Sequence, residues 1–334
     1  QWEKAAEQYD LAGMQNKAIE CRERIKKTDS YTGKLKQELS LFEKQFQSQS
    51  NNISSSYFDD NKFLEADKLL NENPEAYTLY GQGLKFDVQG NYMEAIKYLT
   101  QVIALEPNFA SAYAVRGSAH RQQGSYTKAI EDLTQAIALD PNDYESYYNR
   151  GNARDDQGHL ESAIQDYNQA IHLNPNNAEF YYNRGLAYKK QGDLEKAINN
   201  YNQAIHLDPN HARAYYNRGN IFFGREYLSR ALKDYNQAIS SDPNFTLAYT
   251  NRGNVYFKQG NLKKAEQDYT QVIHLNPYFA GSYQNRGLVR YQLGNLSGTV
   301  NDFQKAAEIF KQQGKHEMSQ KLVATIKNIK SELR

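Results

Sequence analysis

Residues 144–177 read YESYYNRGNARDDQGHLESAIQDYNQAIHLNPNN, and residues 178–211 read AEFYYNRGLAYKKQGDLEKAINNYNQAIHLDPNH. The two stretches have the same length and agree at most positions. The pattern extends in both directions, since prolines recur every 34 residues, at Pro107, Pro141, Pro175, Pro209, Pro243 and Pro277. A fixed period of this length is typical of a repeat architecture.

The repeat divides the chain into units that each contain two helices. Seven units open at Ala76, Ala110, Tyr144, Ala178, Ala212, Thr246 and, in degenerate form, Ala280. Positions 4, 8 and 11 of a unit share one helical face, and a stripe such as Ala163, Tyr167 and Ala170 indicates a second helix. Position 8 is always glycine and position 20 is alanine in six units, so the two helices can cross closely.

The turn between the two helices contains a glycine in six of the units, which can adopt a left-handed conformation without a Cβ clash. The fifth unit has Glu226 there, so we expect its turn to be the most altered. The proline near the end of a unit stops the second helix because it lacks an amide hydrogen.

The period and these residues resemble the tetratricopeptide repeat (TPR) family over residues 76–313. The resemblance implies an all-α fold, a right-handed α-solenoid of about seven helix-turn-helix units. Each unit buries its apolar faces only by stacking on its neighbours, which leaves an open concave surface.

The ends of the chain differ from the repeats. Residues 1–46 predict an N-terminal helical segment with a weak TPR-like hairpin, and the Ser/Asn-rich residues 47–57 predict a linker. Residues 58–75 predict a helix that leads into the first unit. Residues 314–334 predict a capping helix with Met318, Leu322, Ile326, Ile329 and Leu333 along one face.

Composition narrows the function. The 40 Lys and Arg balance 39 Asp and Glu, which gives a net charge of +1 and argues against a basic nucleic-acid binder. No apolar run is long enough to span a membrane. The single cysteine, Cys21, excludes an internal disulfide and favours a reducing, cytoplasmic location. Three of the seven histidines, His172, His206 and His274, recur at equivalent positions of separate units rather than in a cluster. We therefore expect no metal, no cofactor and no enzymatic activity.

Asparagines recur on the face of the first helix opposite the position 4 and 8 stripe. We expect them to face away from the core. A carboxamide offers both a donor and an acceptor, so a row of them can pair with the backbone of an extended peptide. They stand at position 6 (Asn149, Asn183, Asn217, Asn251 and Asn285) and position 9 (Asn152, Asn220 and Asn254). The row is similar to the asparagine ladder in the TPR domain of O-GlcNAc transferase; the other interpretation is an ordinary solvated helix face.

Side chains around this row change along the array and would set specificity. Lys189, Lys190 and Arg213 supply positive charge, and Phe223 and Phe257 supply aromatic surface. A further pattern is structural: most units pair an arginine at position 7 with an aspartate 16 residues later, which predicts an ion pair between the two helices of a unit, packed on tyrosine rings.

The sequence therefore predicts a non-enzymatic scaffold that binds an extended peptide or disordered segment of a partner protein in its concave groove. Two alternatives remain. Terminal segments could fill the groove and make a homo-oligomer, or the array could bind RNA as pentatricopeptide proteins do, which the near-zero charge disfavours.

Overall fold

The computed structural model describes residues 68–69 and 72–332, and the described part is all-helical, as predicted. The predictions for residues 1–67 lie outside it. Contacts divide the chain into two compact units, one ending at Leu173 and one beginning at Asn174. The first contains α4 (Pro74–Val88), α5 (Tyr92–Leu105), α6 (Ala110–Gln122), α7 (Tyr126–Leu139), α8 (Tyr144–Asp156) and α9 (Leu160–Leu173).

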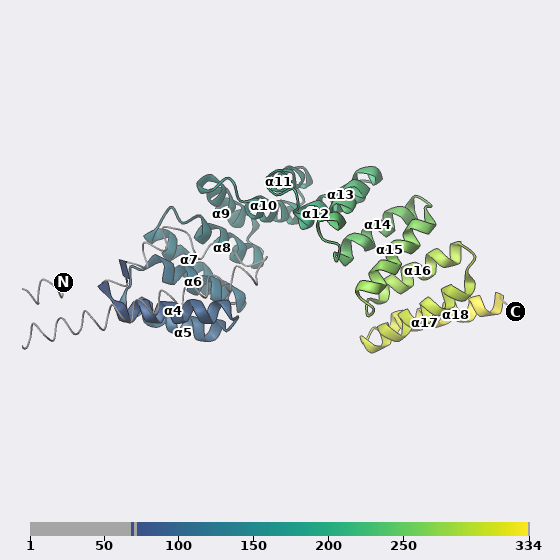
Figure 1. The fold of residues 1–334 in the computed structure, drawn as a ribbon, viewed down its shortest axis with the longest axis horizontal. Helices are drawn as coiled ribbons and strands as arrows, with labels where there is room; N and C mark the ends of the chain where they lie inside the picture. Colours follow the sequence, from purple (N-terminus) through teal and green to yellow (C-terminus); the bar gives the residue numbers. More distant parts are fainter. Residues whose placement is uncertain (1–67, 70–71, 333–334) are drawn as a thin grey trace, which may run out of the picture. The chain divides into compact units, whose positions relative to one another are not determined.

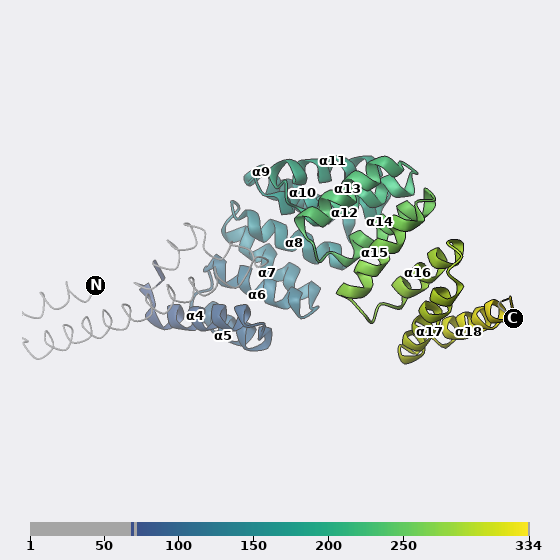
Figure 2. The ribbon, with the colours of Figure 1, turned by 45° about the vertical axis from the view of Figure 1, so that its right-hand side comes forward.

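The second unit contains nine of the described helices, four helix pairs followed by α18, and Figures 1 and 2 show them following one another along the chain. They are α10 (Ala178–Gln191), α11 (Leu194–Leu207), α12 (Ala212–Gly224), α13 (Leu228–Ser241), α14 (Thr246–Lys258), α15 (Leu262–Leu275), α16 (Ala280–Gln292), α17 (Leu296–Gln312) and α18 (His316–Glu332). Each even-numbered helix up to α16 is the first helix of a repeat, and the odd-numbered helix after it is the second.

The paired helices approach closely at the position 8 glycine. A Cβ atom on Gly219 would lie 2.9 Å from Cε1 of Tyr235, and one on Gly253 would lie 2.8 Å from Cε1 of Tyr269. These tyrosines, at position 24 of the repeat and on its second helix, are 0% and 2% exposed. The ring therefore occupies the space that any other residue's Cβ would need.

The turn of the fifth repeat contradicts the sequence prediction of an altered geometry. Glu226 adopts a φ of 63°, in the left-handed region where the equivalent residues are glycines, such as Gly260 with a φ of 73°. Its amide donates to the carbonyl of Phe223 at 3.0 Å, and Tyr227 donates to Phe222 at 2.8 Å. These are the same hydrogen bonds that the glycine turns make. The stacked repeats on either side thus impose the conformation on a residue with a side chain.

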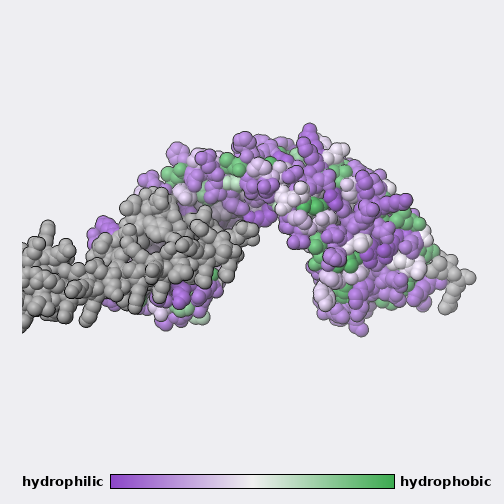
Figure 3. Space-filling model, viewed as in Figure 1, coloured by the Kyte–Doolittle hydropathy of each residue, from purple (hydrophilic) through white to green (hydrophobic). Residues whose placement is uncertain are grey.

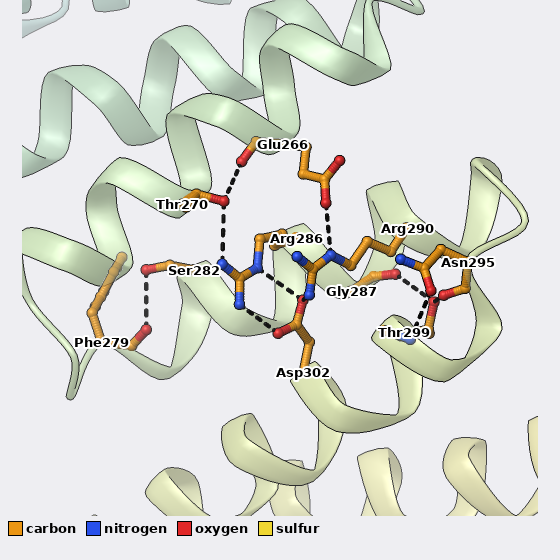
Figure 4. Close-up of polar contacts among 11 residues, drawn as sticks. Glu266, Thr270, Phe279, Ser282, Arg286, Gly287, Arg290, Asn295, Thr299 and Asp302 are labelled. Carbon is orange, nitrogen blue, oxygen red and sulfur yellow. Dashed lines mark hydrogen bonds and ion pairs between the residues drawn. The ribbon is translucent and has the colours of Figure 1, made fainter.

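The predicted pair between position 7 arginine and the aspartate 16 residues later is confirmed. In the seventh repeat, Arg286 donates from Nε and Nη2 to Asp302 at 2.9 and 2.7 Å (Figure 4). Its guanidinium lies 5.8 Å from the Tyr283 ring centroid. Its remaining nitrogen, Nη1, donates to Thr270 of the preceding repeat at 3.2 Å. One guanidinium therefore joins three helices, α15, α16 and α17.

The same arrangement recurs along both units. The bidentate pairs are Arg116–Asp132, Arg150–Asp166, Arg218–Asp234, Arg252–Asp268 and Arg286–Asp302. In the fourth repeat the aspartate is replaced, and Arg184 donates to the amide oxygen of Asn200 at 2.7 Å. This motif accounts for the regular arginines as part of the scaffold rather than as anion-binding groups.

The last helix, α18, packs against α17. Leu322, Ile326 and Ile329 of the predicted stripe are buried against α17, whereas Met318 is 52% exposed and the neighbouring Ser319 is buried. Leu333 lies outside the described residues. No described helix combines the length and the apolar character that a membrane crossing needs.

Candidate functional site

The asparagines at position 9 bind tyrosines of their own repeat. The Tyr235 hydroxyl donates to Oδ1 of Asn220 at 2.8 Å, and the Tyr269 hydroxyl donates to Oδ1 of Asn254 at 2.8 Å. In the third repeat, Tyr167 donates to Asn152 at 2.9 Å. Burial raises the pKa of these tyrosines, so the phenols stay protonated and can donate.

The asparagines at position 6 reach back to the preceding first helix. Asn217 on α12 donates to the Tyr182 hydroxyl of α10 at 3.1 Å and to the carbonyl of Arg213 at 3.0 Å. Asn251 on α14 donates to Oδ1 of Asn220 at 2.8 Å and to the Tyr216 hydroxyl at 3.3 Å. These amides therefore tie adjacent repeats together.

The last link of the series is the loosest. Asn285 on α16 donates to Oδ1 of Asn254 at 3.5 Å, at the limit of hydrogen-bond length. Its own amide oxygen accepts no hydrogen bond from another described residue. Hydrogen bonds connect Asn220, Asn251, Asn254 and Asn285 in one row over α12, α14 and α16. We call these four residues, together with Asn217 on the same helix as Asn220, the amide seam.

The seam changes the expectation that these side chains face away from the core. Asn217 is only 9% exposed, and Asn152 in the third repeat is 8% exposed. Asn217 lies against Tyr182, at position 5 of the preceding repeat, whereas Asn152 lies against Tyr167 of its own repeat. Asn149, Asn183, Asn220, Asn251, Asn254 and Asn285 are half-buried.

A cluster of charged groups lies at the α10 end of the seam. Lys189 donates from Nζ to Oδ1 of Asn217 at 3.1 Å, and burial lowers the pKa of its ammonium. It makes no ion pair with a described residue. Arg213, in contrast, pairs with Glu179 at 2.8 Å and stacks on the Tyr182 ring at 5.2 Å. Lys190 is exposed in the last turn of α10.

His211 belongs to the same cluster, and the sequence analysis missed it. It is 5% exposed, its Nδ1 accepts the Ala214 amide at 3.3 Å, and its ring lies 4.8 Å from that of Tyr182. Burial acts to raise the pKa of the neighbouring Glu179, but His211, whose Nε2 lies 3.4 Å from its Oε1, and the charge of Arg213 bring that pKa below the ordinary value. Its position in the repeat could have identified it, because His211 directly precedes a first helix, as Asp143 and Asn177 do where they cap α8 and α10.

Aromatic side chains continue from Lys189 along position 12. Phe223 and Phe257 pack at the edge of the buried clusters around Tyr235 and Tyr269, and Tyr291 in the seventh repeat is 45% exposed. Lys258 lies 5.9 Å from the Phe223 ring centroid and pairs with Glu226. Figure 3 shows the hydrophobic atoms of this unit as small separate patches among hydrophilic ones.

Comparison with known proteins agrees with this geometry. A TPR repeat family model matches residues 117–158, 151–192, 187–226 and 219–260, and a tetratricopeptide repeat model matches residues 246–279. The chain belongs to the tetratricopeptide repeat family. No curated protein matches it significantly.

Solved TPR structures share the fold. A tetratricopeptide repeat protein from Parabacteroides merdae is 21% identical, with a TM-score of 0.53 over 78% of this chain and 98% of its own. PilF of Pseudomonas aeruginosa is 16% identical, with a TM-score of 0.56 over 65% of this chain and 97% of its own. A chain of the APC/C Cut9-Hcn1 hetero-tetramer is 14% identical, with a TM-score of 0.55 over 78% of this chain and 51% of its own length.

The fourth TPR unit provides a test of what the seam contributes to stability. Leu186 occupies position 9 there, so Tyr201 lacks the asparagine that its equivalents have, and its buried hydroxyl has no hydrogen-bond partner among the described residues. We expect Tyr269→Phe to lower the free energy of unfolding by about 0.5–1.5 kcal/mol, because it breaks the bond to Asn254.

Tyr201→Phe is the matched control. It removes a buried hydroxyl without a protein partner, so stability should be unchanged or higher. Urea unfolding followed by circular dichroism measures both variants. Equal losses in the two would show that the Tyr269–Asn254 bond contributes nothing to this TPR array.

The described residues of the TPR array contain no group of three or more His, Cys, Asp or Glu side chains that could hold a metal ion. Their charged groups form ion pairs within and between helices, and Arg290 of α16 pairs with Glu266 of α15 at 2.7 Å (Figure 4).

Proposed function

We propose that this TPR protein is a non-enzymatic interaction scaffold, and that the first helices of its second unit bind an extended segment of a partner protein. TPR arrays present extended surfaces for such contacts. The observation that supports the proposal is the amide seam, since it brings polar side chains from α12, α14 and α16 into one connected row.

The seam supports a narrower role for the asparagines than a freely solvated row would have. Asn217 uses both amide hydrogens and accepts from Lys189, so its main role is to join repeats. Asn285 makes one long hydrogen bond and keeps its amide oxygen for a ligand. We therefore place the strongest backbone contact at α16.

Position 12 gives the proposed ligand its chemical character. Lys189 on α10 has an amide neighbour but no described carboxylate, so an acidic side chain of the ligand would supply the missing charge. Phe223, Phe257 and Tyr291 follow on the next three first helices and favour apolar residues. The segment that fits is an extended peptide with an acidic residue at the α10 end and apolar residues towards α16.

An array of immobilised random 12-residue peptides, probed with the full chain, tests this function. We expect binding peptides to be enriched in acidic residues followed by apolar ones. For the best peptide, Asn285→Ala should weaken binding roughly 2–13-fold, which corresponds to about 0.5–1.5 kcal/mol, without changing the melting temperature.

Asn301→Ala is the matched control, because Asn301 is an exposed asparagine on α17 that contacts none of the seam residues. It should bind the peptide as the wild type does. A peptide that binds Asn285→Ala and wild type equally well would contradict the proposed site.

A further inference from the structure

A second surface lies at the C-terminal end, between α17 and α18. Each helix is 17 residues long, and Figures 1 and 2 both show them side by side. A groove of about 830 Å³ runs between them. Ala307 and Ile326, which are 5% and 7% exposed, contribute to its lining, and Val323 beside them is 56% exposed.

The repeat geometry indicates what kind of element fits there. Helix α16 is packed by α15 on one side and α17 on the other. Helix α18 is packed by α17, and none of the other described helices packs closely against it. A solenoid continues by adding a helix at such a face. At a rise of 1.5 Å per residue, α17 and α18 offer a length of about 25 Å, enough for a helix of four to five turns.

Charge indicates the chemistry of the occupant. Three lysines line the groove, Lys311, Lys327 and Lys330, and none of them forms an ion pair with a described residue. Its acidic residue, Glu308, is already paired with Lys305 at 3.0 Å. A second copy of the same groove would bring like charges together and is disfavoured.

We infer that the α17–α18 groove binds an amphipathic helix of a partner protein, with an apolar stripe against Val323 and acidic residues towards the three lysines. An amphipathic helix in a groove is a recurrent mode of recognition, in which apolar anchors supply affinity and flanking charges supply specificity. The inference does not depend on the peptide site over α10–α16.

Three labelled 18-residue peptides test it by fluorescence anisotropy with the full chain. All carry a helical pattern of leucines; the first has glutamates beside the leucine stripe, the second has lysines there, and the third has the leucines replaced by serine. We expect the glutamate peptide to bind at least tenfold more tightly than either of the others. Equal binding of the lysine peptide, or no binding at all, would overturn the inference.

Variants locate the site. Val323→Glu changes an exposed residue, so the fold should persist. The variant should bind the glutamate peptide at least tenfold more weakly, and so should Lys327→Glu. Lys233→Glu, on the exposed surface of α13, is the control and should have no effect. Binding that is insensitive to Val323→Glu would place the peptide elsewhere.

A photo-crosslinking amino acid at position 323, used without peptide, tests the competing occupants. We expect no crosslink within the chain or between copies. A crosslink to the chain's own residues 1–67, or a crosslinked dimer, would overturn the assignment to a partner helix.

Discussion

Replacing Arg252 with alanine is expected to lower the free energy of unfolding by about 3–5 kcal/mol at pH 7, since it leaves a buried carboxylate without its partner. Arg252 donates two hydrogen bonds to Asp268, at 2.9 and 2.6 Å, and one to Asn236 of the preceding repeat at 2.8 Å. Asp268 is 4% exposed. The truncation therefore leaves a largely buried carboxylate without its charged partner.

The loss should shrink as the pH falls. Burial raises the pKa of Asp268 above its ordinary value, and the hydrogen bonds and charge of Arg252 oppose that rise. Without Arg252 the folded-state pKa rises further above the unfolded value of roughly 3.9. The part of the Arg252→Ala loss in unfolding free energy that comes from ionised Asp268 is then absent below about pH 3.9. It grows until the pH passes the folded-state pKa of Asp268 in the variant. Urea unfolding at pH 7 and pH 4 measures the difference.

Arg184→Ala is the matched control, because the partner of Arg184 at the aspartate position is the neutral Asn200. It leaves no buried charge there, so its cost should be smaller and should vary less between pH 4 and pH 7. Hydrogen exchange should place the Arg252→Ala loss in α14 and α15, since each repeat contacts only its neighbours. A pH-independent loss in Arg252→Ala would contradict the buried-charge explanation.

The fold could be predicted almost completely from the sequence because equivalent residues make the same contacts between helices in each repeat. Gly253, Ala265 and the proline period specify helix pairs wherever they recur, and Arg252 with Asp268 could be recognised from a constant separation of 16 residues. The prediction for the turn at Glu226 was wrong because it considered only the local preference of a residue with a side chain. The stacked neighbouring repeats fix the backbone there in the same left-handed conformation as in the other turns.

The candidate site was less predictable, since it depends on contacts between repeats. A helical wheel places Asn217 away from its own second helix, but it does not show that Tyr182 of the preceding repeat lies beside it. The burial of His211 against that same tyrosine arises in the same way. Periodicity therefore identified which residues share a face, whereas the stacking of repeats determines which of them remain accessible to a ligand.

Replacing Gly287 with alanine is the second change with a large expected effect. A Cβ atom there would lie 2.5 Å from Cε1 and 2.6 Å from Cδ1 of Phe303, closer than carbon atoms pack. Phe303 is 3% exposed on α17, so its ring has no space to move into. We expect a loss of about 1–3 kcal/mol in the free energy of unfolding, as overpacked cores show.

Gly281→Ala, in the same helix α16, separates this clash from the general effect of removing a glycine. Its Cβ would lie 3.5 Å from the nearest atom of Phe279, an ordinary contact, so the variant should be neutral or gain up to about 1 kcal/mol. The clash at Gly287 should also weaken the pair between Arg286 and Asp302, since relief requires α17 to move away and Asp302 adjoins Phe303. Faster hydrogen exchange in both α16 and α17 would report that movement. A Gly287→Ala protein as stable as Gly281→Ala would show that the helices do not need the glycine in order to cross.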